Sequence, residues 1–133
     1  MAEAGLQPDR YPAHGRRGEA LAQAVTINLM TGVEPPTALF TSQNLLTIGA
    51  IRALHQLGRQ HTVALVGLDD IELGDLLDPP VTVMAQDPTE IGTLAAKRVF
   101  ARLDGDRSPE REFVVPCRLV VRGSGEIRQP TEI

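Results

Sequence analysis

Residues 62–70 read T-V-A-L-V-G-L-D-D and constrain the fold of this chain more than any other stretch. The five residues 63–67 carry no polar side chain and no helical period, which is typical of a strand buried on both faces in a parallel sheet. The strand ends at two adjacent carboxylates, Asp69 and Asp70. In an open parallel sheet, ligands bind beyond the carboxyl ends of the strands, so these carboxylates lie where a binding residue is expected.

Two further apolar stretches end in the same way. Residues 37–41 run into Gln43 and Asn44, and residues 81–85 run into Gln86. Because the carboxyl ends of parallel strands meet at one edge of a sheet, the three strands are expected to bring these polar side chains together.

Helical patterns separate the strands. Apolar residues are spaced for an amphipathic helix over residues 17–30, and a second helix is predicted over residues 44–57, with Asn44 as its N-cap. The sequence D-P-T-E at 87–90 combines an N-cap, a proline at the first helical position and a carboxylate at the third, which predicts a helix to about residue 103. The alternation predicts an α/β fold with an open, mainly parallel sheet flanked by helices.

The remaining segments carry weaker signals. Residues 1–15 are punctuated like a connector with one short strand, and residues 71–78 have room for at most a single helical turn. Residues 113–121, interrupted by Pro116, are predicted to form one or two strands.

Composition limits the function. The chain has 133 residues, 42% of them hydrophobic, which suffices for one domain with its own core. A formal net charge of −4 argues against a DNA-binding surface on this chain alone. Cys117 is the single cysteine, so no internal disulfide and no zinc site are expected. No signal-like start and no apolar run of membrane length are present, so we expect a cytoplasmic protein that does not enter a membrane.

Four motifs, taken in order, resemble the effector-binding domain of LacI/GalR-type bacterial transcriptional regulators. They are P-T-A-L-F-T-S-Q-N-L-L-T-I-G-A-I-R-A-L at 36–54, V-A-L-V-G-L-D-D at 63–70, L-L-D-P-P-V-T-V-M-A-Q-D-P-T-E-I-G at 76–92 and L-V-V-R-G-S at 119–124. The resemblance implies a periplasmic-binding-protein-like (type I) fold, in which two α/β lobes close on a small molecule and a separate N-terminal domain binds operator DNA.

The resemblance also implies a domain organisation. Residues 1–133 correspond to the C-terminal part of the effector-binding domain, without the DNA-binding head and most of the first lobe. We therefore expect a piece of a longer regulator. In such proteins the segment corresponding to residues 88–115 crosses back and packs on the first lobe.

By the same resemblance, the ligand-binding residues are Gln43 or Asn44, Asp69 and Gln86. A carboxylate accepts hydrogen bonds from two neighbouring hydroxyls, and an amide both donates and accepts, so a sugar or nucleoside effector fits. Alternatives remain for each residue. For Asn44 the role of helix N-cap is favoured over direct ligand contact, which makes Gln43 the better contact candidate, and Asp69 and Gln86 could bind backbone amides.

Asp70 is interpreted as structural. The family commonly has Asn-Asp where this chain has Gln43-Asn44, so the identity of the effector stays open.

The sequence-based hypothesis is a non-enzymatic sensor lobe that needs no cofactor and meets operator DNA only through an absent N-terminal domain. One alternative is a periplasmic-type sugar-binding protein of the same fold. Another is a magnesium-dependent enzyme or phospho-acceptor domain that uses Asp69 and Asp70. The sequence shows no glycine-rich phosphate loop and no Ser/His/Asp or Cys/His set, which argues against an enzyme.

Apolar residues outside the expected core predict a homodimer. Helix 44–57 has apolar residues on more than one face, and the loop 71–78 carries leucines where a monomer would prefer polar residues. In the family the matching helix and loop form the two-fold contact, so an isologous dimer is expected through Ile48, Ile51, Leu73 and Leu76. The alternative is that these residues belong to the core.

Overall fold

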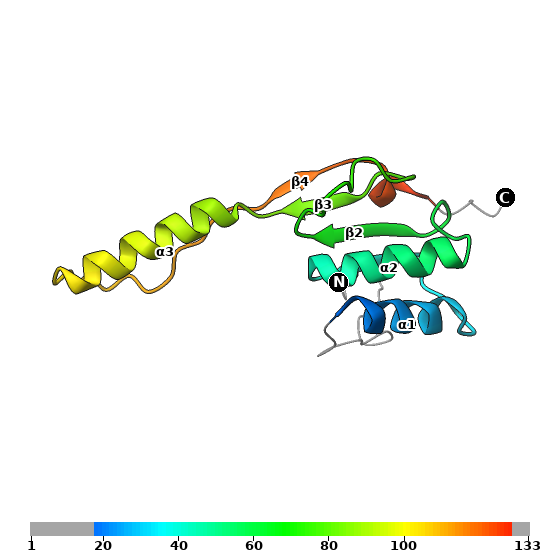
Figure 1. Cartoon of the computed structure of the whole chain (residues 1–133), viewed down its shortest axis with the longest axis horizontal. Coiled ribbons are helices and arrows are strands. Elements are labelled where there is room, and N and C mark those ends of the chain that lie inside the picture. The colour runs from blue at the N-terminus through cyan, green and yellow to red at the C-terminus, as the bar shows by residue number, and fades with distance from the viewer. Residues whose placement is uncertain (1–17, 129–133) are drawn as a thin grey trace, which may run out of the picture.

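The structure, a computed structural model, describes residues 18–128. The expectations for residues 1–15 and for the first residue of helix 17–30 lie outside this range. The elements follow one another along the chain as α1 (Glu19–Met30), β1 (Ala38–Thr41), α2 (Asn44–Gln56), β2 (Ala64–Leu68), β3 (Thr82–Ala85), α3 (Pro88–Leu103), β4 (Arg118–Val120) and the short 3-10 helix η3 (Ser124–Glu126) (Figure 1).

The four strands form one sheet in the order β1-β2-β3-β4. β1 and β2 are parallel, β2 and β3 are parallel, and β4 pairs antiparallel with β3 at the edge. The predicted α/β fold with a mainly parallel sheet is therefore confirmed.

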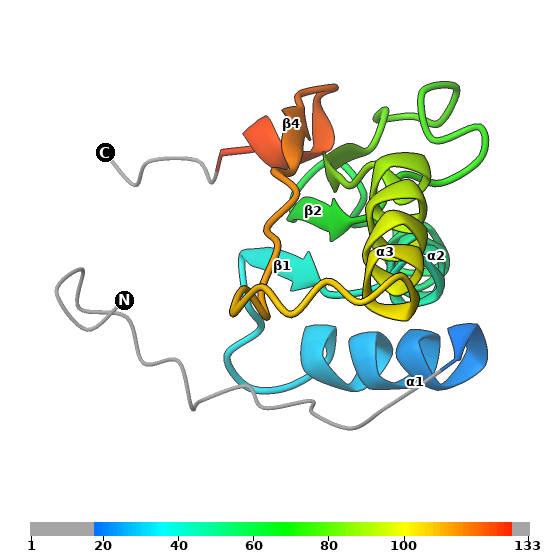
Figure 2. The ribbon, with the colours of Figure 1, turned by 90° about the vertical axis from the view of Figure 1, so that its left-hand side faces the viewer.

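The core lies between the sheet and the helices α1 and α2, which pack against each other (Figure 2). Its buried cluster consists of Met30, Ala50, Leu54, Val63 and Leu65. The two helices approach closely at Gly49, where an added Cβ would lie 2.6 Å from the Cβ of Ala22. A residue without a side chain is needed at this crossing.

The prediction that β2 is buried on both faces is wrong. Val63 and Leu65 are only 4% and 3% exposed, whereas the alternate residues Ala64, Val66 and Leu68 are half-buried. The helices cover the first face. The second is covered near Val66 by η3, whose Gly125 leaves no room for a side chain. An apolar run indicates a strand, but burial of its second face depends on what the rest of the chain places there.

Two local predictions need correction. The N-cap of α2 is Gln43 rather than Asn44, which is the first helical residue. Only Arg118–Val120 forms a strand within residues 113–121, because pairing with β3 is confined to these three positions. By contrast, the start of α3 is confirmed, since Asp87 caps it by accepting from the Glu90 N–H at 2.9 Å.

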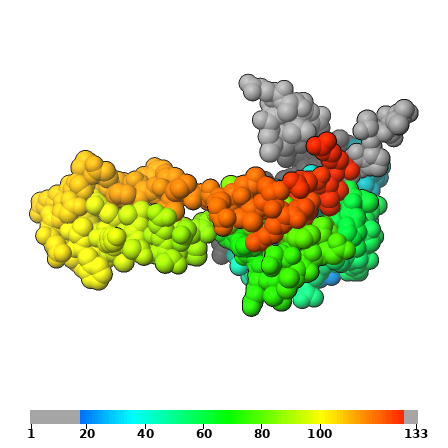
Figure 3. Space-filling view, turned by 90° about the horizontal axis from the view of Figure 1, so that it is seen from above, coloured from blue at the N-terminus to red at the C-terminus, as the bar shows by residue number. Residues whose placement is uncertain are grey.

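α3 and residues 104–117, which we call the arm, project away from the sheet (Figures 1 and 3). No residue of α3 is buried. The returning segment runs beside the helix, where Arg102 donates to the carbonyls of Asp106 and Ser108 at 2.8 and 2.6 Å. Val99, on the same helix, is 58% exposed. The arm thus keeps its own hydrogen bonds but leaves apolar surface uncovered.

Within residues 18–128, no helix combines the length and the apolar character needed to cross a membrane.

Candidate functional site

The carboxyl ends of β1, β2 and β3 meet beside a hollow of about 440 Å³. Its lining consists of Asn44, Asp69, Asp70, Gln86, Pro88 and Ile91. The polar members come from three different strand ends, as the parallel topology requires. This is the edge of the sheet at which the sequence predicts a binding site.

Asp69 and Gln86 are brought into direct contact. Gln86 Nε2 donates to Asp69 Oδ1 at 2.6 Å. Asp69 has a positive φ of 67° and its N–H donates to the Met84 carbonyl at 3.0 Å. Aspartate tolerates this left-handed conformation better than most residues. It turns the chain out of the sheet immediately after β2 and places the carboxylate at the hollow.

The neighbouring carboxylate, that of Asp70, is bound by the guanidinium of Arg122. Its two oxygens accept from Nη1 and Nη2 of the guanidinium at 2.6 and 2.7 Å. The hydrogen bonds from Arg122 hold the pKa of Asp70 below its usual range, and the N–H of Ile71 adds to this effect. The geometry agrees with the interpretation of Asp70 as structural. Sequence reasoning did not single out Arg122.

Asn44 lines the hollow, whereas Gln43 does not. Gln43 is half-buried, and its carbonyl accepts from the N–H of Thr47 at 3.0 Å. Asn44 is exposed, and its Oδ1 accepts from the N–H of Leu45 at 2.8 Å, which leaves its amide nitrogen available. The geometry therefore favours Asn44 over Gln43 as the neighbour of Asp69.

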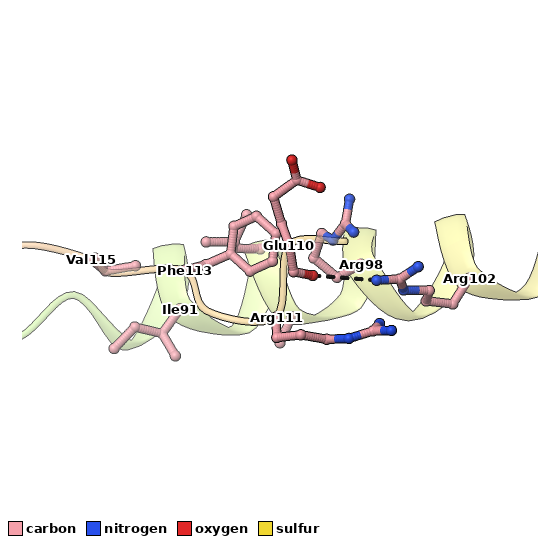
Figure 4. Close-up of a pocket in the computed structure, with 9 residues that line it drawn as sticks. Ile91, Arg98, Arg102, Glu110, Arg111, Phe113 and Val115 are labelled. Carbon is pink, nitrogen blue, oxygen red and sulfur yellow. Dashed lines mark hydrogen bonds between the residues drawn. The ribbon is translucent and has the colours of Figure 1, made fainter. Parts of the chain in front are cut away.

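A second hollow, of about 470 Å³, lies in the arm between α3 and the returning segment (Figure 4). Arg98 lies there with its guanidinium 4.8 Å from the ring centre of Phe113 and donates to Ser108 at 2.9 Å. Arg102 donates to the carbonyl of Glu110 at 3.2 Å. These guanidinium groups already serve the structure of the arm, so we place the candidate site at the strand ends instead.

The residues predicted to form a dimer contact differ in exposure. Leu73 and Leu76, in the turn after β2, are 62% and 74% exposed. Ile48 is half-buried, and Ile51 packs against the core cluster. The leucines are thus free to meet a partner, while Ile51 already contributes to this chain's own core.

Comparisons with known proteins agree with the observed fold. The model of the family described as periplasmic binding protein-like domain matches residues 1–125. The HTH-type transcriptional regulator PtxS of Pseudomonas aeruginosa is 42% identical over 91 residues, which are 67% of this chain and 27% of that protein. The chain thus spans about a quarter of the length of this curated relative.

Two solved structures share the fold. A LacI-family regulatory protein from Chloroflexus aggregans superposes with a TM-score of 0.81 at 25% identity, over 93% of this chain and 46% of that one. A LacI-family transcriptional regulator from an Arthrobacter species, in complex with lactose, gives a TM-score of 0.72 at 27% identity, over 84% and 42% of the two chains.

Proposed function

Because the chain belongs to the family of periplasmic binding protein-like domains, in the form found in LacI-family transcriptional regulators, we propose that it is the effector-sensing lobe of such a regulator. It binds a small polyhydroxylated metabolite, a sugar or nucleoside, at the strand ends. The observation that carries this proposal is the contact between Gln86 and Asp69 beside the hollow. The lactose complex of a relative supports the class of ligand.

The chemistry of the site suits hydroxyl groups. The carboxylate of Asp69 receives one hydrogen bond from Gln86, so lone pairs remain for two neighbouring hydroxyls of a ligand. Gln86 and Asn44 add amide groups that donate and accept. Each hydrogen bond to the charged carboxylate contributes about 1.5–3 kcal/mol, so Asp69 supplies a large share of the affinity.

In this proposal the lobe carries out no reaction. The effector stabilises one arrangement of the effector-binding domain and so changes the DNA affinity of the full-length regulator, a coupling of typically about 1–3 kcal/mol. The regulator acts in the cytoplasm. Its DNA contacts come from another part of the regulator, because this chain has a net charge of −4 and DNA binding requires positive charge to neutralise the phosphates.

We place the packing surface for the other lobe on the arm. Support comes from α3, which buries no residue, and from Phe100 and Leu103, which are 65% and 76% exposed. Apolar side chains exposed to this degree on one element are typical of a contact surface.

We also propose an isologous dimer in which Leu73 and Leu76 form the centre of the contact and Ile48 its edge. Replacing Leu73 and Leu76 together by glutamate is expected to convert the dimer to a monomer, because burying two carboxylates at a two-fold contact is unfavourable. Val33→Glu is the matched control, since Val33 is fully exposed elsewhere. Light scattering decides: a dimer that persists in the double variant contradicts the proposed contact.

The sensing function is tested by a thermal-shift screen with sugars and nucleosides. At least one compound is expected to raise the melting temperature, and Asp69→Ala is expected to abolish that rise. Glu72→Ala removes an exposed carboxylate three positions away and serves as the control. If no compound stabilises the protein, or if both variants respond like the wild type, the proposed function is wrong.

A further inference from the structure

The backbone conformation of Asp69 must be held in place on both sides, by the segment that precedes this residue and by the segment that follows it. Its left-handed backbone, with φ at 67°, is a conformation that costs a residue with a side chain about 1 kcal/mol or more unless its surroundings hold it. On the N-terminal side, β2 and the hydrogen bond to the Met84 carbonyl hold it. On the C-terminal side the chain leaves the sheet, and the next fixed point is the carboxylate of Asp70.

Arg122 provides that fixed point because it is itself well anchored. Its own N–H donates to Thr82 Oγ1 at 3.1 Å, and its side chain is only 20% exposed. Its Nη1 also lies 3.4 Å from the carbonyl of Val81. The side chain of Arg122 therefore extends from the segment after β4, past Val81 just before β3, to the turn that follows β2.

The pairing of Arg122 with Asp70 fixes direction as well as distance. Two parallel N–H···O bonds between planar groups restrict rotation of the carboxylate, which a single ammonium contact does not do. The N–H of Ile71 donates to the same Asp70 oxygen at 2.9 Å. The backbone on the C-terminal side of Asp69 is thereby tied to the sheet.

We propose that Arg122 is a positioning residue for the effector site: by clamping Asp70, it holds Asp69 in the left-handed conformation that presents its carboxylate to Gln86 and to a ligand hydroxyl. This inference rests on the proposed function. It adds to the site a residue that does not line the hollow and lies 52 positions along the chain from Asp70.

The test uses the Gln86 side-chain amide as a reporter in NMR spectra of the whole chain without effector. The signals of Asp69→Ala define the position of this amide when its acceptor is absent. In Arg122→Gln the Gln86 signals are expected to move most of the way to that position. Arg122→Lys is expected to restore them only in small part, because lysine keeps the charge but not the paired hydrogen bonds.

Arg118→Gln is the matched control. It removes the cation of Arg118 on β4, whose charge also lowers the pKa of Asp70; the hydrogen bonds described for that carboxylate come from Arg122 and Ile71, not from Arg118. Its Gln86 signals are expected to stay at the wild-type position. If instead Arg118→Gln moves them as far as Arg122→Gln does, the effect is one of charge and the clamp is refuted.

Backbone signals of α2 show whether each variant keeps the fold. If Arg122→Gln loses them, Asp70→Asn takes its place, because the Asp70 side chain is 44% exposed and the substitution is nearly isosteric. The clamp is overturned if Gln86 keeps its wild-type signals in a folded variant that lacks the Arg122–Asp70 pair. No effector is added, so a negative sugar screen does not affect this result.

Discussion

Two glycines in different helices should respond to the same substitution with opposite signs. Gly92, in α3, has nothing within 4 Å of an added Cβ. Gly92→Ala is therefore expected to stabilise the helix by about 0.5–1 kcal/mol, the difference in helix propensity between the two residues.

Gly49→Ala gains the same propensity in α2 but cannot be accommodated. The new Cβ would lie 2.6 Å from the Ala22 Cβ and 2.8 Å from the backbone nitrogen of Gln23, and backbone cannot rotate away as a side chain can. Forcing α1 and α2 apart costs about 1–3 kcal/mol, typical of an overpacked core, and loosens the pairing of Arg52 with Glu19. The net loss is expected to be about 1–2 kcal/mol after the gain in propensity.

Urea unfolding followed by circular dichroism measures the effect of Gly49→Ala as a lower midpoint. Hydrogen exchange of the α3 amides measures the effect of Gly92→Ala, because a helix without buried residues can open independently of the core. The reasoning is refuted if Gly49→Ala is as stable as the wild type, or if Gly92→Ala speeds exchange in α3.

Two further substitutions probe the segment after β4. Ser124→Ala removes a buried hydroxyl that donates to the Leu65 carbonyl at 2.6 Å and accepts from the Thr82 N–H at 2.9 Å. Leaving the carbonyl and the N–H unpaired is expected to lower the free energy of unfolding, measured with urea, by about 1–3 kcal/mol for each group. A loss below about 1 kcal/mol contradicts the stabilising role of these two hydrogen bonds. Asp70→Asn tests the pH dependence of stability. Arg122 holds the pKa of Asp70 in the folded protein below its usual range. The stability from this pair is therefore present above the pKa of Asp70 in the unfolded chain, and it is lost as the pH falls through the pKa of Asp70 in the folded protein. The melting-temperature gap between wild type and Asp70→Asn should therefore shrink as the pH falls from about 6 to about 3, and a constant gap would count against the pair.

Local signals in the sequence predicted the elements correctly where a few adjacent residues decide the structure. The start of α3 follows from Asp87 and Pro88, and the predicted end of the second helix at residue 57 lies within one residue of the observed end of α2 at Gln56. The strands β1, β2 and β3 follow from short apolar runs between turn signals. The same reasoning placed Asp69 and Gln86 at one edge of the sheet, where they form a hydrogen bond.

Contacts between distant segments could not be predicted in this way. Arg122 and Ser124 belong to the V-R-G-S motif, which the sequence shows only as part of a resemblance. Each has a separate partner far away in the chain, Asp70 for the arginine and Leu65 for the serine. Sequence spacing carries no information about such pairs. The closeness of α1 and α2 at Gly49 was missed for the same reason.

The overestimated strand at residues 113–121 has a different origin. β-branched and aromatic residues favour extended backbone, but a strand also needs a partner with unpaired hydrogen-bonding groups. β3 offers such a partner only to Arg118–Val120, and the preceding residues run beside a helix instead.

The central claim is that the ends of β1, β2 and β3 bind a hydroxyl-rich effector, and NMR chemical-shift mapping tests it most directly. A sugar or nucleoside that raises the melting temperature is titrated into the labelled protein. The largest chemical-shift changes are expected at Asn44, Asp69 and Gln86, including the Gln86 side-chain amide. The signals of the second hollow, in the arm around Arg98 and Phe113, are expected to stay unchanged. Changes concentrated in this second hollow, or spread without a maximum at the strand ends, would contradict binding at the strand ends.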